Sequence, residues 1–358
     1  MYAVDDLLKH VTRVGEVANS SALVPIAKTI LFASTPDGPN TVLKATDFQT
    51  SIVDNVPFLP YVGFDYCVDA QKLIQLLKSL KGEKIDIGVG ENRFKVTSAH
   101  GKYELPYLDG SEFPEIEIIK GENKAPAYLL ERALELTMGS VSSDDLRPTM
   151  TGVHFDTELG YVVATNGHKL TRYKSQFKGE SFTLPTRAYN LLKGYGDAEV
   201  SYHLSSNAIH FSIFGDNVSE MVDFKVTRVE GNYPPYNKVI PTENTKEYQI
   251  PQKDLLEAVK RVSLFSSQDS NTIALELGDE QLVTGKDESY GNSAKETLQG
   301  KYNSDPIKIG LNSKYLIELL NTSGEGLLTL SFSEVNKPVL ISNTSNPKLL
   351  QLVMPIQI

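Results

Sequence analysis

The chain has no tryptophan and only one cysteine, Cys67, among its 358 residues. A single cysteine excludes an intrachain disulfide and is typical of a protein of the reducing cytoplasm. No apolar run approaches the ~18 residues of a membrane-spanning helix, because Pro25 and Lys28 interrupt the longest candidate, residues 23–33. The N-terminus also lacks the basic and apolar segments of a secretory signal. We therefore expect a cytoplasmic protein with no membrane partner.

Recognisable catalytic motifs are absent as well. The sequence contains no P-loop, no Gly-x-Ser-x-Gly elbow and no His-Glu-x-x-His pair, and no predicted helix follows Gly88-Val89-Gly90 as a dinucleotide site requires. Asp144-Asp145 is the only acidic pair of interest, and a solvated loop is the favoured interpretation. A metal-dependent hydrolase or nuclease using this pair remains the alternative. We expect no catalytic residues, no metal ligands and no cofactor.

The chain does contain a threefold repeat. Leu-Leu pairs inside amphipathic helical patterns lie at 7/8, 129/130 and 255/256, and a second, interleaved series lies at 76/77, 191/192 and 319/320. A period of about 120 residues is far longer than the roughly 20–50 residues of a solenoid repeat and equals an ordinary domain. The repeat predicts three similar domains with two short helices each, spanning residues 1–120, 121–243 and 244–358.

Strand patterns fill the spaces between the helices. A hairpin-like pair follows the second helix of each copy, and an example is 84–89 with 94–97. The corresponding pairs in the other copies are 199–204 with 208–213 and 327–332 with 338–342. Helices and antiparallel strand pairs in this order predict an α+β fold rather than the alternation of a parallel sheet.

Charge is distributed unevenly between these elements. The whole chain carries a net charge of −10. The six predicted helices, at 5–18, 69–81, 126–138, 186–193, 252–263 and 313–320, hold 12 Lys and Arg against 9 Asp and Glu. Basic residues are therefore enriched on the helices. Helices favour Lys and Arg in any case, so this pattern alone leaves open whether the helices face a polyanion.

The most specific local pattern is residues 162–171, which contain Asn166-Gly167 between alternating residues. Asn-Gly is the strongest two-residue hairpin signal, because both positions accept positive φ. The alternation predicts a hairpin with Val163 and Thr165 opposite Lys169 and Thr171. The hairpin pattern alone predicts only that His168 is an exposed side chain in the turn.

At this segment the sequence resembles the bacterial sliding clamp family, the beta subunit of DNA polymerase III. The family's Ala-Thr-Asp-Gly-His-Arg-Leu is present as residues 164–170, its Glu-Gly-x-Phe-Pro-x-Tyr as 230–236, and its C-terminal Val-Met-Pro as 353–355. Arg147-Pro148, Gly152-Val153 and the segment around Leu105-Pro106-Tyr107 also fit. The resemblance covers the whole chain and agrees with the repeat.

The resemblance implies a non-enzymatic processivity factor for DNA polymerase. Two subunits would join head to tail into a six-domain ring, a homodimer that encircles double-stranded DNA without reading its sequence. Helices would line the hole and sheets the outside. The replicative polymerase, the clamp loader and repair proteins would dock through short linear motifs.

By motif match, the resemblance also implies a peptide-binding cleft between the middle and last domains. Its residues are mainly apolar, and His168 and Lys169 could supply polar contacts. The cleft would include Met150, Thr165, Gly167, His168, Lys169, Leu170, Pro234, Lys238, Val239, Pro338, Val353, Met354, Pro355 and Ile356. Because residues 353–358 are apolar, we expect a docked segment rather than a frayed tail.

Some positions depart from the family's pattern. Lys169 replaces an Arg and Asn166 an Asp, which could shift the peptide preference, and Ser21 lies where some members carry a DNA-contacting Arg. The expected DNA-facing residues are Lys72, Lys78, Arg147 and Lys193. The expected dimer-interface residues are Phe113, Leu264 and Phe265. An interaction module that does not form a ring remains a further alternative.

Overall fold

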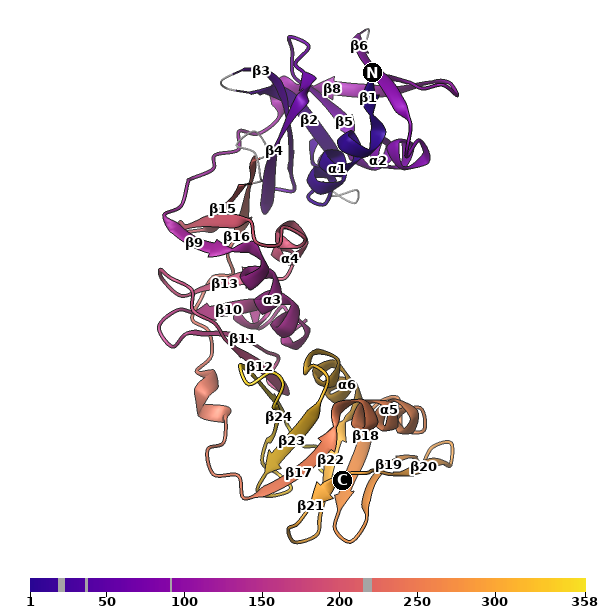
Figure 1. The fold of residues 1–358 in the computed structure, drawn as a ribbon, viewed down its shortest axis with the longest axis vertical. Coiled ribbons are helices and arrows are strands. Elements are labelled where there is room, and N and C mark those ends of the chain that lie inside the picture. Colours follow the sequence, from indigo (N-terminus) through magenta and orange to yellow (C-terminus); the bar gives the residue numbers. More distant parts are fainter. Residues whose placement is uncertain (19–22, 36–37, 91, 215–220) are drawn as a thin grey trace. The chain divides into compact units, whose positions relative to one another are not determined.

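The computed structural model describes residues 1–18, 23–35, 38–90, 92–214 and 221–358. Ser21 lies outside the described residues. The chain forms two compact units. Unit 1 comprises Met1–Glu131 and Arg187–Arg228, and unit 2 comprises Arg132–Thr186 and Val229–Ile358. Figure 1 shows the elements of both units in sequence colours.

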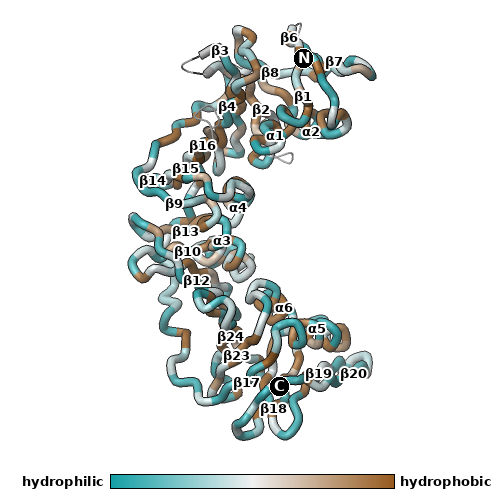
Figure 2. Tube along the Cα trace, viewed as in Figure 1, coloured by the Kyte–Doolittle hydropathy of each residue, from teal (hydrophilic) through white to brown (hydrophobic). Residues whose placement is uncertain are grey.

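The described residues form six α-helices, each within a few residues of its predicted position. Their buried residues recur at helical spacing, as Leu7, Val11 and Val14 do in the first helix, so that one face packs on a sheet. Figure 2 shows hydrophilic and hydrophobic residues alternating along the helices. The helices are α1 (Val4–Gly15), α2 (Ala70–Ser79), α3 (Ala127–Thr137), α4 (Ala188–Leu192), α5 (Gln252–Ser263) and α6 (Ser313–Thr322).

The start of two helices is fixed by the preceding residue. The Asp69 side chain accepts a hydrogen bond from the Lys72 backbone N–H at the start of α2, and the Asn312 side chain accepts one from the Tyr315 N–H at the start of α6. Such caps satisfy one of the N–H groups that a helix start leaves unpaired. The cap before α6 also places Tyr315 at the first turn, where it meets the site described below.

One twelve-stranded sheet forms the frame of unit 1, and its paired strands are antiparallel. Helix α1 packs beside α2 against it. In spatial order the strands are β1 (Tyr2–Ala3), β6 (Lys84–Gly90), β7 (Arg93–Thr97), β8 (Lys102–Asp109), β5 (Tyr66–Asp69), β2 (Thr29–Thr35), β3 (Gly38–Thr46), β4 (Thr50–Pro60), β16 (Met221–Thr227), β15 (Ala208–Phe214), β14 (Glu199–Leu204) and β9 (Asn123–Pro126).

Unit 2 contains a nine-stranded and a four-stranded sheet, with α5 and α6 packed together. The larger sheet runs β13 (Phe182–Pro185), β10 (Gly152–Asp156), β11 (Tyr161–Thr165), β12 (Lys169–Lys174), β25 (Leu349–Val353), β24 (Val339–Asn343), β23 (Leu327–Phe332), β17 (Lys246–Pro251) and β21 (Lys301–Tyr302). The smaller runs β20 (Asn292–Thr297), β19 (Gln281–Asp287), β18 (Thr272–Leu277) and β22 (Ile307–Asn312).

The predicted α+β class is confirmed, since all three predicted strand pairs form antiparallel hairpins after α2, α4 and α6. The two compact units, however, do not coincide with the three predicted repeats. Strand β4 pairs with β16, and β12 pairs with β25, so each large sheet continues from one repeat into the next. This pairing divides the middle repeat between the two units, and the three-domain division stays a prediction.

Candidate functional site: a cleft in unit 2 and a basic pocket in unit 1

A cleft of about 640 Å³ opens in unit 2. Its walls come from β12, β25, the 3₁₀ turn η5 (Tyr236–Val239) and the turn between β23 and β24. Among the residues that the structure describes, no aspartate or glutamate lines it. The lining residues are Met150, Thr165, Gly167, Lys169, Leu170, Pro234, Pro235, Tyr236, Lys238, Val239, Pro241, Asn336, Lys337, Pro338, Leu352 and Met354.

A small hydrophobic cluster forms the floor of this cleft. Leu170, Tyr236 and Leu352 pack together with Val163, and Met354 lies against them. Burial raises the pKa of Tyr236, whose hydroxyl donates a 2.8 Å hydrogen bond to Asp156. The floor is therefore apolar, while Met150 and Met354 offer side chains that adapt to different ligands.

The hairpin β11–β12 forms as predicted, but its turn differs. Thr165 pairs with Leu170 rather than with Lys169, and of the turn residues only Gly167 has a positive φ, +86°. The Asn166 side-chain oxygen accepts hydrogen bonds of 2.9 Å from the backbone N–H groups of His168 and Lys169. This Asx-type turn satisfies the backbone without a positive φ at Asn166, so the two-residue turn that we predicted is wrong.

The C-terminal segment is docked, as its apolarity predicts. Beyond β25, the Met354 N–H donates to the His168 carbonyl and the Ile356 N–H to the Gly310 carbonyl, both at 2.8 Å. A Cβ at Gly310 would lie 2.4 Å from the Ile356 carbonyl oxygen and 2.5 Å from Ile358. Only glycine leaves room for the segment at this point of β22, and the segment in turn supports the cleft.

The ammonium group of Lys169 binds other groups of the protein itself. The Lys169 side chain is 4% exposed, and its ammonium group binds the Glu318 carboxylate of α6 and the Gly139 carbonyl. The ammonium also lies 5.3 Å from the centre of the Tyr315 ring, on which His168 stacks at 5.9 Å. Since these partners satisfy the charge of Lys169, this residue has little left to offer a ligand.

The structure brings ten of the fourteen predicted cleft residues into the lining. His168, Val353, Pro355 and Ile356 are the exceptions: His168 faces Tyr315, Val353 is fully buried in the core, and the other two line a neighbouring pocket. Sequence reasoning missed Pro235, Tyr236, Pro241, Asn336, Lys337 and Leu352. Of these, Pro235 and Tyr236 lie inside the quoted 230–236 signature, whereas nothing in the sequence marks Asn336 or Lys337.

Arg147 lies beside the cleft hairpin. Its guanidinium is 3.4 Å from the position that a Cβ on Gly167 would occupy. The neighbouring Asp144 accepts a hydrogen bond from the Leu146 N–H and lies 3.6 Å from the Arg147 guanidinium, so this carboxylate stabilises a turn. Over the described ranges, no group of three His, Cys, Asp or Glu side chains could hold a metal ion.

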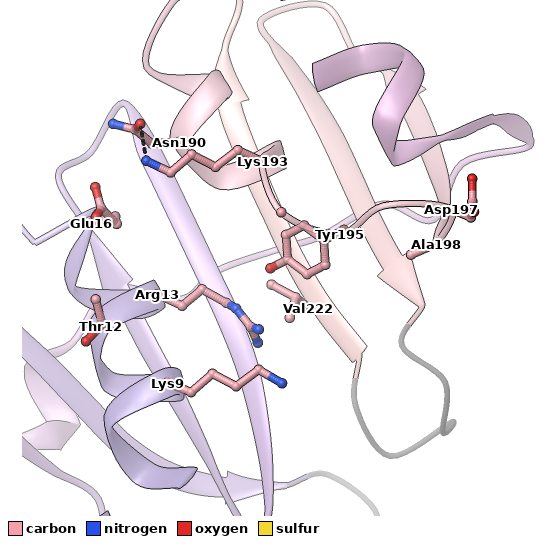
Figure 3. Close-up of a pocket in the computed structure, with 11 residues that line it drawn as sticks. Lys9, Thr12, Arg13, Glu16, Asn190, Lys193, Tyr195, Asp197, Ala198 and Val222 are labelled. Atoms are coloured by element: carbon pink, nitrogen blue, oxygen red, sulfur yellow. Dashed lines mark hydrogen bonds between the residues drawn. The ribbon is translucent and has the colours of Figure 1, made fainter. Parts of the chain in front are cut away.

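A second pocket, of about 570 Å³, lies in unit 1 between α1 and the α4–β14 connection. Figure 3 shows Lys9 and Arg13 extending side by side from α1 toward Tyr195 and Val222, while Lys193 turns toward Asn190. Lysine and arginine side chains outnumber the carboxylates of Glu16 and Asp197 in its lining. We call it the basic pocket; its lining is Lys9, Thr12, Arg13, Glu16, Asn190, Lys193, Gly194, Tyr195, Asp197, Ala198 and Val222.

A buried carboxylate holds Arg13 at this pocket. Asp54, on β4 opposite Val222 of β16, is fully buried, and its Oδ2 lies 3.0 Å from both the Arg13 guanidinium and His10 Nδ1. The guanidinium also lies 5.3 Å from the centre of the Tyr195 ring. Burial raises the pKa of Tyr195 to about 12, which keeps its hydroxyl protonated.

The remaining predicted residues lie apart from both sites. Lys72 and Lys78 are exposed on α2. Leu264 and Phe265, just after α5, are 80% and 43% exposed, whereas Phe113 is half-buried against a cluster that includes Leu31 and Cys67. The packing of Phe113 is that of an ordinary core residue, and its role in an interface stays a prediction.

Comparison with known proteins agrees with this fold. The DNA polymerase III beta subunit N-terminal domain matches residues 2–117, and the C-terminal domain of the same subunit matches residues 237–357. The beta sliding clamp of Synechococcus elongatus is 25% identical over 98% of this chain and all of its own length. That of Proteus mirabilis is 25% identical over 99% of this chain and 98% of its own.

Solved structures show the same architecture. The sliding clamp of Bartonella birtlesii, solved with griselimycin bound, superimposes with a TM-score of 0.90 over 100% of this chain and 99% of its own, at 24% identity. The DNA polymerase III beta subunit of Pseudomonas aeruginosa gives 0.86 over 99% and 98%, also at 24%. The repeated helix–hairpin units thus define a DNA-clamp fold. The chain belongs to the DNA polymerase III beta-subunit family, the bacterial sliding clamps.

Proposed function

We propose that this chain keeps a replicative DNA polymerase on its template by holding the polymerase at the cleft of unit 2 while the clamp slides along DNA. The observation that carries this proposal is the cleft. Its apolar floor, two methionines and docked C-terminal segment suit a short extended peptide with large apolar side chains. Clamp-loader and repair proteins would use the same cleft through similar peptides.

The clamp itself would be a ring of two copies joined head to tail, with three domains per copy at residues 1–120, 121–243 and 244–358. Leu264 and Phe265 support this proposal, because two large apolar side chains exposed side by side are typical of a contact surface. The interface would join the first domain of one copy, which contains Phe113, to the third domain of the other copy, which contains Leu264 and Phe265. A sedimentation mass of about twice 39.5 kDa is expected.

Duplex DNA would be held by diffuse attraction to basic side chains, which permits sliding because phosphate contacts carry no sequence information. The exposed Lys72 and Lys78 and the pocket residue Lys193 are the proposed contacts in unit 1. Arg147 is the proposed contact in unit 2, although its position beside Gly167 also suits a ligand in the cleft. The protein would act without catalysis, in the cytoplasm where the DNA lies.

The test is fluorescence anisotropy with a labelled Gln-Leu-x-Leu-Phe peptide. We expect micromolar, saturable binding to the full chain and none to a truncation that lacks residues 354–358. Leu159→Ala, at an exposed position outside the cleft lining, is the control and should bind normally. Unchanged affinity of the truncated protein would disprove the cleft assignment, and no binding to the intact, folded chain would disprove the proposed function.

A further inference from the structure

In the described part of the chain, the lining of the cleft carries charge of only one sign. Its charged residues are Lys169, Lys238 and Lys337, with no carboxylate among them. This contrasts with the chain as a whole, in which 45 Asp and Glu outnumber 35 Lys and Arg. A ligand in the cleft therefore contacts charged side chains whose sign is opposite to the net charge of the chain.

The three lysines are not equivalent. Lys169 is buried and neutralised by Glu318. Lys238 and Lys337 are both exposed, and neither takes part in an ion pair within the described part of the chain. Glu334 is the acidic residue nearest to Lys337 in sequence. It is exposed in the same turn as Lys337 but does not line the cleft.

The two free ammonium groups come from different walls. Lys238 belongs to η5, and Lys337 belongs to the turn that joins β23 to β24. The same lining contains Leu170 and Leu352, which form the apolar floor. A peptide that places its large apolar side chains on the floor would therefore pass a lysine on each wall. Opposite charges in such an arrangement increase specificity and speed association.

We propose, building on the proposed function, that the cleft selects peptide segments that carry an aspartate or glutamate on each side of the apolar anchor, and that Lys238 and Lys337 determine this preference. The apolar floor supplies most of the affinity, and the two lysines discriminate between segments. Each exposed lysine–carboxylate pair is worth about a two- to fivefold change in affinity and weakens as salt screens it.

The test compares three labelled peptides with the same Gln-Leu-Ser-Leu-Phe core, flanked on both sides by Asp, Asn or Lys. We expect the full chain at low salt to bind the Asp-flanked peptide about tenfold more tightly than the Asn-flanked one, and the Lys-flanked peptide most weakly. At about 0.5 M salt the difference should fall below threefold, because the Debye length shrinks.

Matched variants show which lysines cause the preference for the Asp-flanked peptide. Lys238→Gln with Lys337→Gln should reduce the Asp-over-Asn preference to less than twofold, and each single variant should remove part of that preference. Lys301→Gln, at an exposed lysine of β21 outside the cleft lining, should keep the full preference. Equal binding of the Asp- and Asn-flanked peptides would overturn this inference and leave the proposed function intact, whereas no binding of any peptide would overturn both.

Discussion

The cleft of unit 2 and the basic pocket of unit 1 have similar volumes, about 640 and 570 Å³, and different linings. The cleft has an apolar floor, and its buried lysine is neutralised by Glu318. The pocket has a charged lining, and its arginine is held by the buried Asp54. Both sites therefore neutralise their most buried cation, because an unpaired buried charge is costly, and they differ in that the pocket lining contains carboxylates whereas the described lining of the cleft does not.

The largest expected effect is a loss of stability in unit 1. Replacing Asp54 by Ala should lower the free energy of unfolding by about 3 kcal/mol, because it leaves His10 and Arg13 without their shared, fully buried partner. Urea denaturation followed by circular dichroism measures the loss. Asp54→Asn is the matched variant that keeps the shape and removes the charge. A loss below about 1 kcal/mol in both would show that the buried carboxylate does not stabilise unit 1.

A second substitution concerns the cleft alone. Gly310→Ala should weaken peptide binding about tenfold, since its Cβ would overlap the Ile356 carbonyl and displace the docked C-terminal segment. Anisotropy titration measures the change, with Gly88→Ala as the control because a Cβ there meets nothing within 4 Å. If Gly310→Ala bound normally, the position of the C-terminal segment would not matter to the cleft.

The ion pair beneath the cleft offers a smaller effect. Glu318→Gln leaves the buried Lys169 ammonium with the Gly139 carbonyl and should cost about 1 kcal/mol of stability, because water can reach the half-exposed position of Glu318. The released charge should also raise affinity for an Asp-flanked peptide severalfold. Denaturant titration and anisotropy give both readouts, and lower affinity with unchanged stability would contradict the structural role of this pair.

The most gradual effect is a pH dependence that both units share. Burial lowers the pKa of His210 in unit 1 and of His154 in unit 2 below the ordinary value of 6.5. The unfolded chain then binds protons more readily than the folded one, so this stability is fully present above pH 6.5 and is lost as pH falls through the folded-state pKa.

Thermal unfolding measured between pH 5 and 7.5 should show the slope of stability against pH. His154→Phe keeps an aromatic ring on Tyr233, where the imidazole now stacks at 4.4 Å, and should reduce the slope. Tyr290→Phe, at a side chain that is 83% exposed, should leave the slope unchanged. An identical slope in the wild type and in His154→Phe would exclude the His154 side chain as its origin.

Much of the local structure is predictable from the sequence. Six helices, the three hairpins after α2, α4 and α6, and the β11–β12 hairpin all follow from short-range periodicity, which records the face of each element that is buried. The motifs at residues 164–170, 230–236 and 353–355 also indicate the family, and the resemblance that they carry implies ten of the cleft residues. These features depend on residues that are close together in the sequence, so one sequence is enough to predict them.

Other features depend on residues that are far apart in sequence. Pairing of β4 with β16 and of β12 with β25 joins repeats that no periodicity links. The Lys169–Glu318 pair connects positions 149 residues apart and gives a predicted cleft residue a partner within the protein. Lys337 reaches the cleft only because β24 lies beside β25. The sequence by itself therefore determined the elements and the family, whereas tertiary packing decided which charges remain free to meet a ligand, because only packing brings a distant carboxylate to one lysine and leaves another exposed.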